Sequence, residues 1–527
     1  MTKLLFESSE WTLDTMARTY DAIANIAEGD LGLDTYPNQI EIVSAEQMLD
    51  MYASGGLPRM YKHWSFGKRF MHQEGLYRKG LPMAYELVIN SVPCINYCME
   101  QNTMAMQALV MAHAAFGHNH FFKNNYLFRT RTDAESVLDY LGFARNYIRM
   151  CEEKYGEREV EKLLDAAHAL SVYGVFRYER PHILTKKERE DREQKARMYR
   201  EGSFDLIMAT TIPNQKNQFW KSLETDPTIA ARLKKKMRLP EDNLLYFIEK
   251  HAPRLEEWQR EIIHIVRYIA EYFYPQKQTK MMNEGCATFV HYYIMNALYR
   301  KGCISEGAML EVIDSHTNVI RQLNFDDPHY HDFNPYNLGW NMMRDIARIA
   351  TGYENWTIDP KEEGSRKCNR EQLAEDREWF PDIALCGDWR SALKYAWANF
   401  RDESFILQYV SPRFMREKRM FLIRNDTKEP HVLVRDIADE RGYRNVRQAL
   451  ARQHDINLFE PPIEVSDTDL LGDRTLYLRH KANDFIPLHE ADRNATLEYV
   501  RYLWGYQTRI ESIGPKNDEL LSAFTIE

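Results

Sequence analysis

Residues 282–291 read Met-Asn-Glu-Gly-Cys-Ala-Thr-Phe-Val-His, and this stretch decides how the rest of the chain is interpreted. It places two ionisable groups, Glu284 and His291, inside a run whose apolar residues repeat with the period of a helix. The pattern predicts a largely buried helix from Met282 to about Arg300. Because a buried carboxylate is unstable unless it is paired or bound to a metal, Glu284 needs a partner from another part of the chain.

The composition is that of a globular protein large enough for two or more domains. The chain has 527 residues, of which 44% are hydrophobic and 28% charged. A net charge of −9 speaks against nucleic-acid binding, which needs a clustered basic excess. No run of 18 apolar residues and no signal peptide are visible, so we expect a cytoplasmic protein without membrane insertion. Seven scattered cysteines favour neither a disulfide framework nor a zinc finger.

Helical periodicity dominates the chain as far as about residue 416. The hydrophobic pattern predicts strands near 40–43 and 84–90, and Pro275 is expected to end a helix just before the central stretch. The longer helices are predicted over residues 8–29, 94–115, 132–173, 242–274 and 305–321.

The pattern changes near Met420, where alternating apolar residues replace the helical period. The resulting order of strands and helices predicts a small α+β unit at the C-terminus. The fold class is therefore mainly α with a small C-terminal α+β domain, and the expected domains are residues 1–415 and 418–527. The strands are predicted at 420–424, 431–436, 463–468, 474–480 and 506–512, with helices over 441–453 and 489–503.

A second cluster of ionisable residues lies far upstream, where His113 and His118 flank the end of a predicted helix. Residues five apart lie about 140° apart on a regular α-helix, so these two converge only if the helix ends or bulges at Gly117. With Glu284 and His291 they form a candidate site for a divalent metal such as zinc, to which His120 is a further candidate.

The spacing within the central stretch limits what each residue can do at such a site. Glu284 and His291 are about 10.5 Å apart along a helix axis, so one binds the metal and the other orients a ligand. The alternative is a polar core without metal, in which the histidines bond to backbone carbonyls and Glu284 pairs with Arg or Lys. His329 and His331 suggest a His-rich surface loop. No P-loop or dinucleotide fingerprint is present, so no nucleotide cofactor is indicated.

Several segments together resemble the SpoVR (stage V sporulation protein R) family over nearly the whole chain. The chain departs from the family's usual pattern at Cys286, where Trp is usual, and at Val290, where an aromatic residue is usual. The segments that carry the resemblance are Asn283–His291, Ala112–Asn125, His63–Lys68, Tyr272–Gln276, Ser315–Val319, Asn334–Gly339 and Asp402–Phe405.

The resemblance implies a role in forming the spore cortex, a peptidoglycan layer, or a stress-related counterpart in bacteria that do not sporulate. Asn283-Glu284-Gly285-x-Ala287 also resembles the helix that supplies the glutamate ligand of gluzincin metallopeptidases, although the chain has no H-E-x-x-H motif. Two functions follow as expectations. One is a metal-dependent hydrolase of amide or peptide linkages, and the other is a non-catalytic regulatory protein that acts through protein partners.

Overall fold

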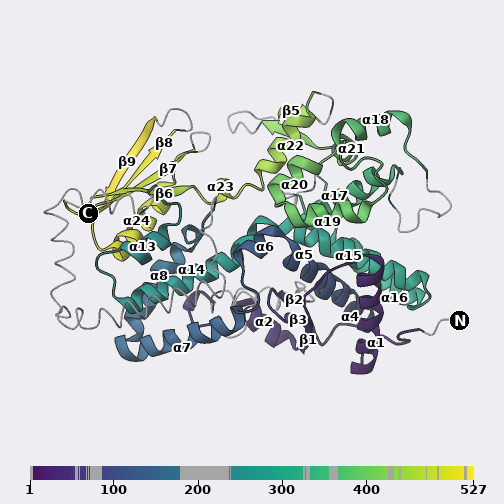
Figure 1. Cartoon of the computed structure of the whole chain (residues 1–527), viewed down its shortest axis with the longest axis horizontal. Coiled ribbons are helices and arrows are strands. Elements are labelled where there is room, and N and C mark those ends of the chain that lie inside the picture. Colours follow the sequence, from purple (N-terminus) through teal and green to yellow (C-terminus); the bar gives the residue numbers. More distant parts are fainter. Residues whose placement is uncertain are drawn as a thin grey trace, which may run out of the picture. The chain divides into compact units, whose positions relative to one another are not determined.

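The computed structural model confirms the predicted fold class, since helices predominate and a small sheet with helices lies near the C-terminus (Figure 1). In the described part of the chain, no helix combines the length and the apolar character needed to cross a lipid bilayer. The structure describes residues 4–53, 57, 60–66, 68, 71, 86–177, 237, 239–324, 327, 333–354, 356, 366–424, 433–437, 439, 441–469, 472–482, 486–514 and 519–526.

The chain divides into two compact units, and each is made of two separate stretches of sequence. The first unit contains Met1–Asn146 and Pro275–Ile456, and the second contains Tyr147–Tyr274 and Asn457–Glu527. Two of the divisions in the sequence fall within helices. One lies in α7 (Val137–Tyr155), between Asn146 and Tyr147, and the other lies in α14 (Glu257–Gln278), between Tyr274 and Pro275.

The core of the first unit forms around α15 (Lys280–Arg300), the helix predicted from the central stretch. Helix α15 packs along the π-helical segment η2 (Met111–His118) and along α17 (Pro335–Thr351). Its apolar side chains are buried on nearly all sides, as expected for a helix in the middle of a core. The other helices of this unit are α1 (Leu13–Ala24), η1 (Asn25–Asp30), α2 (Ala45–Ala53), α4 (Met104–Val110), α5 (Asn119–Asn124), α6 (Tyr126–Arg131), α16 (Glu306–Val319), α18 (Arg370–Trp379), α19 (Trp389–Asn399), α20 (Asp402–Tyr409), α21 (Pro412–Glu417) and α22 (Tyr443–Arg452).

A three-stranded sheet with the strand order β1-β3-β2 also belongs to this unit, and two of its strands contact η2. Strand β3 (Cys94–Met99) pairs in parallel with β1 (Asn38–Val43) and antiparallel with β2 (Glu86–Ile89). The prediction of a helix over 94–115 is therefore wrong for its first six residues. The side chains of β3 are buried on both faces except at its last residue, so the strand is a short apolar run, which periodicity alone cannot distinguish from a buried helix.

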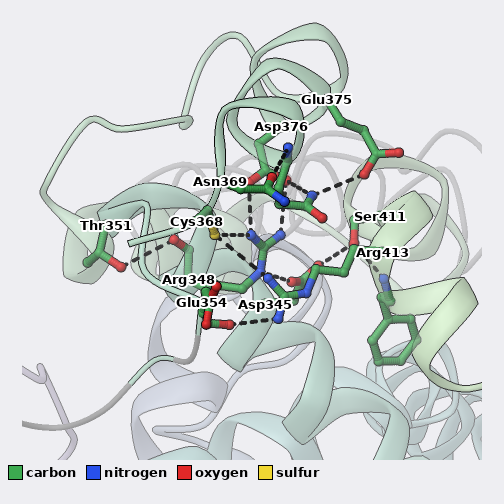
Figure 2. Close-up of polar contacts among 12 residues, drawn as sticks. Asp345, Arg348, Thr351, Glu354, Cys368, Asn369, Glu375, Asp376, Ser411 and Arg413 are labelled. Carbon is green, nitrogen blue, oxygen red and sulfur yellow. Dashed lines mark hydrogen bonds and ion pairs between the residues drawn. The ribbon is translucent and has the colours of Figure 1, made fainter. Parts of the chain in front are cut away.

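A buried ion-pair network fixes α17 to the segments that follow it. The Arg348 guanidinium donates to both carboxylate oxygens of Asp376 at 2.8 and 3.0 Å and to Asp345 at 2.6 Å (Figure 2). Ser411 donates to the other oxygen of Asp345 at 2.5 Å. Since every member is satisfied, the network orients α17 without leaving a buried charge unpaired. A two-stranded sheet of β4 (Phe421–Arg424) and β5 (Leu433–Ile437) follows in the sequence.

The second unit carries a four-stranded sheet, of which the first three strands were predicted and the last was not. Its strands are β6 (Ile463–Thr468), β7 (Leu476–Lys481), β8 (Thr508–Ile513) and β9 (Leu520–Ile526), in that order. The connection between the parallel strands β7 and β8 is α24 (Glu490–Trp504), which packs on β8 and β9. The remaining helices are α8 (Glu157–Ala169), η3 (Ser171–Tyr173), α13 (Leu244–His251) and α23 (Ile456–Phe459).

The prediction that Pro275 ends a helix is wrong. Helix α14 continues through Pro275 to Gln278, and the break before α15 lies at Thr279. The hydroxyl of Thr279 donates to the Pro275 carbonyl at 2.7 Å, so this buried hydroxyl is satisfied at the break.

Candidate metal centre

The two upstream histidines lie on η2, where the helix widens to the i→i+5 hydrogen-bonding pattern of a π-helix. This widening brings residues five apart to nearly the same face, so His113 and His118 point the same way. Their ring centroids are 4.6 Å apart. The convergence predicted at Gly117 is thus confirmed, by a bulge in the helix and not by its end.

Gly117 also allows η2 to approach α15 closely. A Cβ atom at residue 117 would lie 2.5 Å from the Cα atom of Ala287, a distance that real side chains do not adopt. Only glycine therefore fits at this contact between backbones.

The position of α15 is fixed on another side and at its beginning. Gly285 and Gly339 cross so closely that a Cβ on Gly339 would lie 2.4 Å from the Met281 carbonyl oxygen. The buried Asp402 carboxylate accepts hydrogen bonds from the backbone N–H groups of Met281 at 2.8 Å and Met282 at 2.9 Å. It satisfies two of the unpaired N–H donors of the first helical turn, and it lies at the positive end of the helix dipole.

His113, His118 and Glu284 converge as the prediction requires. The Glu284 Oε2 atom lies 3.6 Å from His118 Nε2 and 3.9 Å from His113 Nε2. One donor atom from each residue lies within 4.8 Å of the others. Bond lengths of 2.0–2.2 Å to a tetrahedral zinc would place ligand atoms about 3.3–3.6 Å apart, so a small adjustment suffices.

Glu284 Oε2 has no hydrogen-bond donor among the described residues, although it is buried. The Glu284 side chain as a whole remains 18% exposed. A buried carboxylate oxygen without a donor is unfavourable, and a cation would remove that penalty. The arrangement of this oxygen between two imidazole nitrogens therefore fits a divalent metal.

Two imidazoles of the cluster, those of His113 and His291, are held in the neutral form. Burial lowers the pKa of His113 well below its ordinary value, and the neighbouring His118 and His291 lower it further. Burial followed by His316 and His118 has the same effect on the pKa of His291. Both rings are therefore neutral near pH 7 and hold a lone pair on one nitrogen.

Two residues on α15 orient the histidines of η2. Asn283 Oδ1 lies 2.9 Å from His118 Nδ1, and His291 Nδ1 lies 2.9 Å from His113 Nδ1. An amide oxygen can only accept, so His118 donates from Nδ1, and Nε2 is the nitrogen that lies on the Glu284 side. Contacts of this kind are the usual second layer around a metal-binding histidine.

Glu86, the first residue of β2, is the acidic residue that the sequence analysis missed. Its Oε1 atom lies 3.7 Å from His113 Nε2, and its side chain is 19% exposed. Burial, followed by the nearby Glu284 carboxylate, raises the pKa of Glu86 to about 8. The only signal in the sequence was its place in the strand predicted over 84–90, and that pattern gives no indication of the site.

The other predicted residues separate into two groups. His291 reaches the cluster through His113, whereas His120 does not join it. The His120 Nδ1 atom lies 3.0 Å from the backbone N–H and carbonyl of Asp34, and the ring packs on Trp397. His329 and His331 lie outside the described residues.

Comparison with known proteins agrees with the resemblance in the sequence. Residues 10–459 match the family model described as SpoVR like protein, and residues 461–515 match the model of the SpoVR-like C-terminal domain. A curated relative from Escherichia coli (strain K12), named "Uncharacterized protein YcgB", is 46% identical over 517 residues, which cover 97% of this chain and 94% of the relative. No solved structure matches the chain. The chain belongs to the SpoVR family.

Proposed function

We propose that His113, His118 and Glu284 bind a divalent metal such as zinc. The observation that carries this proposal is the buried Glu284 oxygen, which faces the Nε2 atoms of two imidazoles and has no donor among the described residues. Two histidines and one glutamate are a known ligand set of catalytic zinc sites, which keep a further position for water or substrate.

We infer that the site performs hydrolysis and that Glu86 is the proton-handling group. A metal held by these three residues would supply a Lewis acid that activates water. Glu86 lies on the His113 side of the cluster and is placed to accept a proton from such a water at its carboxylate. Metallopeptidases with the H-E-x-x-H motif take this glutamate from the residue after the first histidine, which here is Ala114.

The proposed substrates are amide or peptide linkages of cell-wall metabolism. The family name refers to sporulation, and the family is associated with the peptidoglycan of the spore cortex. The charge of a bound metal would lower the pKa of Glu86 from the value of about 8 that it has in the metal-free site. A single divalent metal with both Glu284 and Glu86 ionised would leave no net positive charge at the site. Such a centre suits a neutral carbonyl group better than a phosphate dianion, which is usually bound by additional cations.

The test is metal analysis of the purified protein and of Glu284→Gln. We expect about one equivalent of metal per chain, and at least a tenfold loss of zinc affinity in the variant. His120→Asn is the matched control, because this buried histidine lies just after η2 and the asparagine oxygen can accept the hydrogen bond that the Asp34 backbone N–H donates to Nδ1. Its zinc affinity should equal that of the wild type.

The opposite result would support the alternative function. If the wild-type protein retains no metal and Glu284→Gln has the same zinc affinity as the wild type, the cluster is a polar core. A non-catalytic regulatory protein that acts through protein partners would then be the better proposal.

A further inference from the structure

Three buried histidines form a continuous chain that leads away from the candidate metal centre. His113 Nδ1 lies 2.9 Å from His291 Nδ1, and His291 Nε2 lies 2.9 Å from His316 Nδ1. The rings come from η2, α15 and α16, and each residue is less than 8% exposed. Each contact joins two nitrogens of neutral rings, so one nitrogen must donate and the other must accept.

The proposed metal site decides the direction of the chain. His113 Nε2 lies on the Glu284 side, 3.9 Å from Oε2, so a metal held there would need the lone pair of Nε2. A neutral ring carries its one hydrogen on the other nitrogen, so Nδ1 of His113 holds it. His291 then accepts at Nδ1 and donates from Nε2 to His316 Nδ1. All three tautomers are fixed in turn.

We propose that His291 and His316 are positioning residues that direct the His113 Nε2 lone pair into the metal centre. The inference rests on the proposed metal site and adds residues that bind no metal themselves. Without an acceptor at His316 Nδ1, the tautomer of His291 that carries its hydrogen on Nε2 loses the hydrogen bond that stabilises it. His113 could then carry its hydrogen on Nε2, where it would face the Glu86 and Glu284 carboxylates and could not bind a metal.

The experiment compares His316→Asn with His316→Leu in the full-length protein, with zinc alone titrated against a chromophoric chelator. The two side chains have nearly the same shape, but only asparagine offers an oxygen close to the position of Nδ1. We expect the leucine variant to bind zinc about 10–100-fold more weakly and the asparagine variant to recover most of this loss. Equal affinities of the two variants would overturn the positioning role, because a purely packing role would affect both alike.

A second measurement needs no variant at position 316 to fold. Nitrogen NMR of histidine-labelled, metal-free wild-type protein distinguishes the two neutral tautomers, and a His113→Asn spectrum assigns the signal. We expect hydrogen on Nδ1 of His113, and a hydrogen on Nε2 would overturn the inference. Failure of the proposed function would look different, since the wild-type protein itself would then bind no zinc.

Discussion

At the residue scale, the chain separates ligands from the groups that support them. His118 is oriented by Asn283, the residue before the third proposed ligand, while His113 is oriented by His291, seven residues after it. One helix therefore supplies a ligand and both orienting contacts. This explains why Asn283, Glu284 and His291 occur together in a single stretch of sequence.

The raised pKa of Glu86 predicts how the metal-free protein responds to pH. The folded protein keeps the Glu86 proton up to about pH 8, whereas the unfolded chain releases it near its ordinary pKa of 4.5. The folded state binds more protons between these values, so Glu86 makes the protein less stable as pH rises from about 4.5 to 8. Glu86→Gln removes this loss, and its melting temperature relative to the wild type should rise across that range.

The measurement is thermal unfolding with a chelator between pH 5 and 8.5. Glu46→Gln, an exposed carboxylate on α2, is the control for removing an acidic side chain. A difference between Glu86→Gln and wild type that stays constant with pH would contradict the prediction. Zinc affinity of Glu86→Gln should remain close to that of the wild type, because Glu86 is not one of the proposed ligands.

At the element scale, the site depends on a helix that widens within η2. We expect Gly117→Ala to destabilise the protein by about 1–3 kcal/mol, because the new methyl group would overlap the backbone of α15. The helices would have to separate, and His113 and His118 would move away from Glu284. Zinc affinity should therefore fall together with stability.

Gly142→Ala is the matched control for this substitution. Gly142 lies within α7, and a Cβ there would meet no atom within 4 Å. This change should stabilise the protein by roughly 0.4–1 kcal/mol through the lower entropy of the unfolded chain. A Gly117→Ala protein with wild-type melting temperature and zinc affinity would show that the close approach is not required.

Elements differ in how much of them can be predicted from sequence. Periodicity predicts helix α15 and the strands β2, β6, β7 and β8, because each keeps a regular pattern of apolar residues. It did not predict β9, whose side chains are mostly exposed. The π-helical turn does not follow from periodicity either, since its residues would suit an α-helix equally well. It is recognised only from its tertiary contact, where Gly117 meets Ala287. Glu86 was missed for the same reason, because no local pattern connects β2 with η2.

At the scale of the whole molecule, the boundary expected from the sequence differs from the boundary of the compact units. The expected domain of residues 418–527 stays a prediction, whereas the first compact unit ends at Ile456 in the sequence. Helix α22 lies between these two boundaries. Its residues Tyr443, Val446 and Leu450 are buried in the same core as α20, so the change to alternating residues near Met420 precedes the end of the first unit.

Limited proteolysis under native conditions tests which boundary governs folding. Cleavage near residue 417 should not release residues 418–527, since release would expose the apolar face of α22 and break the contact of Arg416 with Tyr443. Residues 457–527 are held as well, because β6 bonds to Glu241 through two backbone hydrogen bonds and the buried Trp504 stacks on Phe247. The nicked chain should therefore elute from a sizing column at its original position and separate only in denaturant. A fragment of residues 418–527 that elutes alone and unfolds cooperatively would contradict this expectation and establish the α+β domain as an independent unit, because a segment without its own core could not show such a transition.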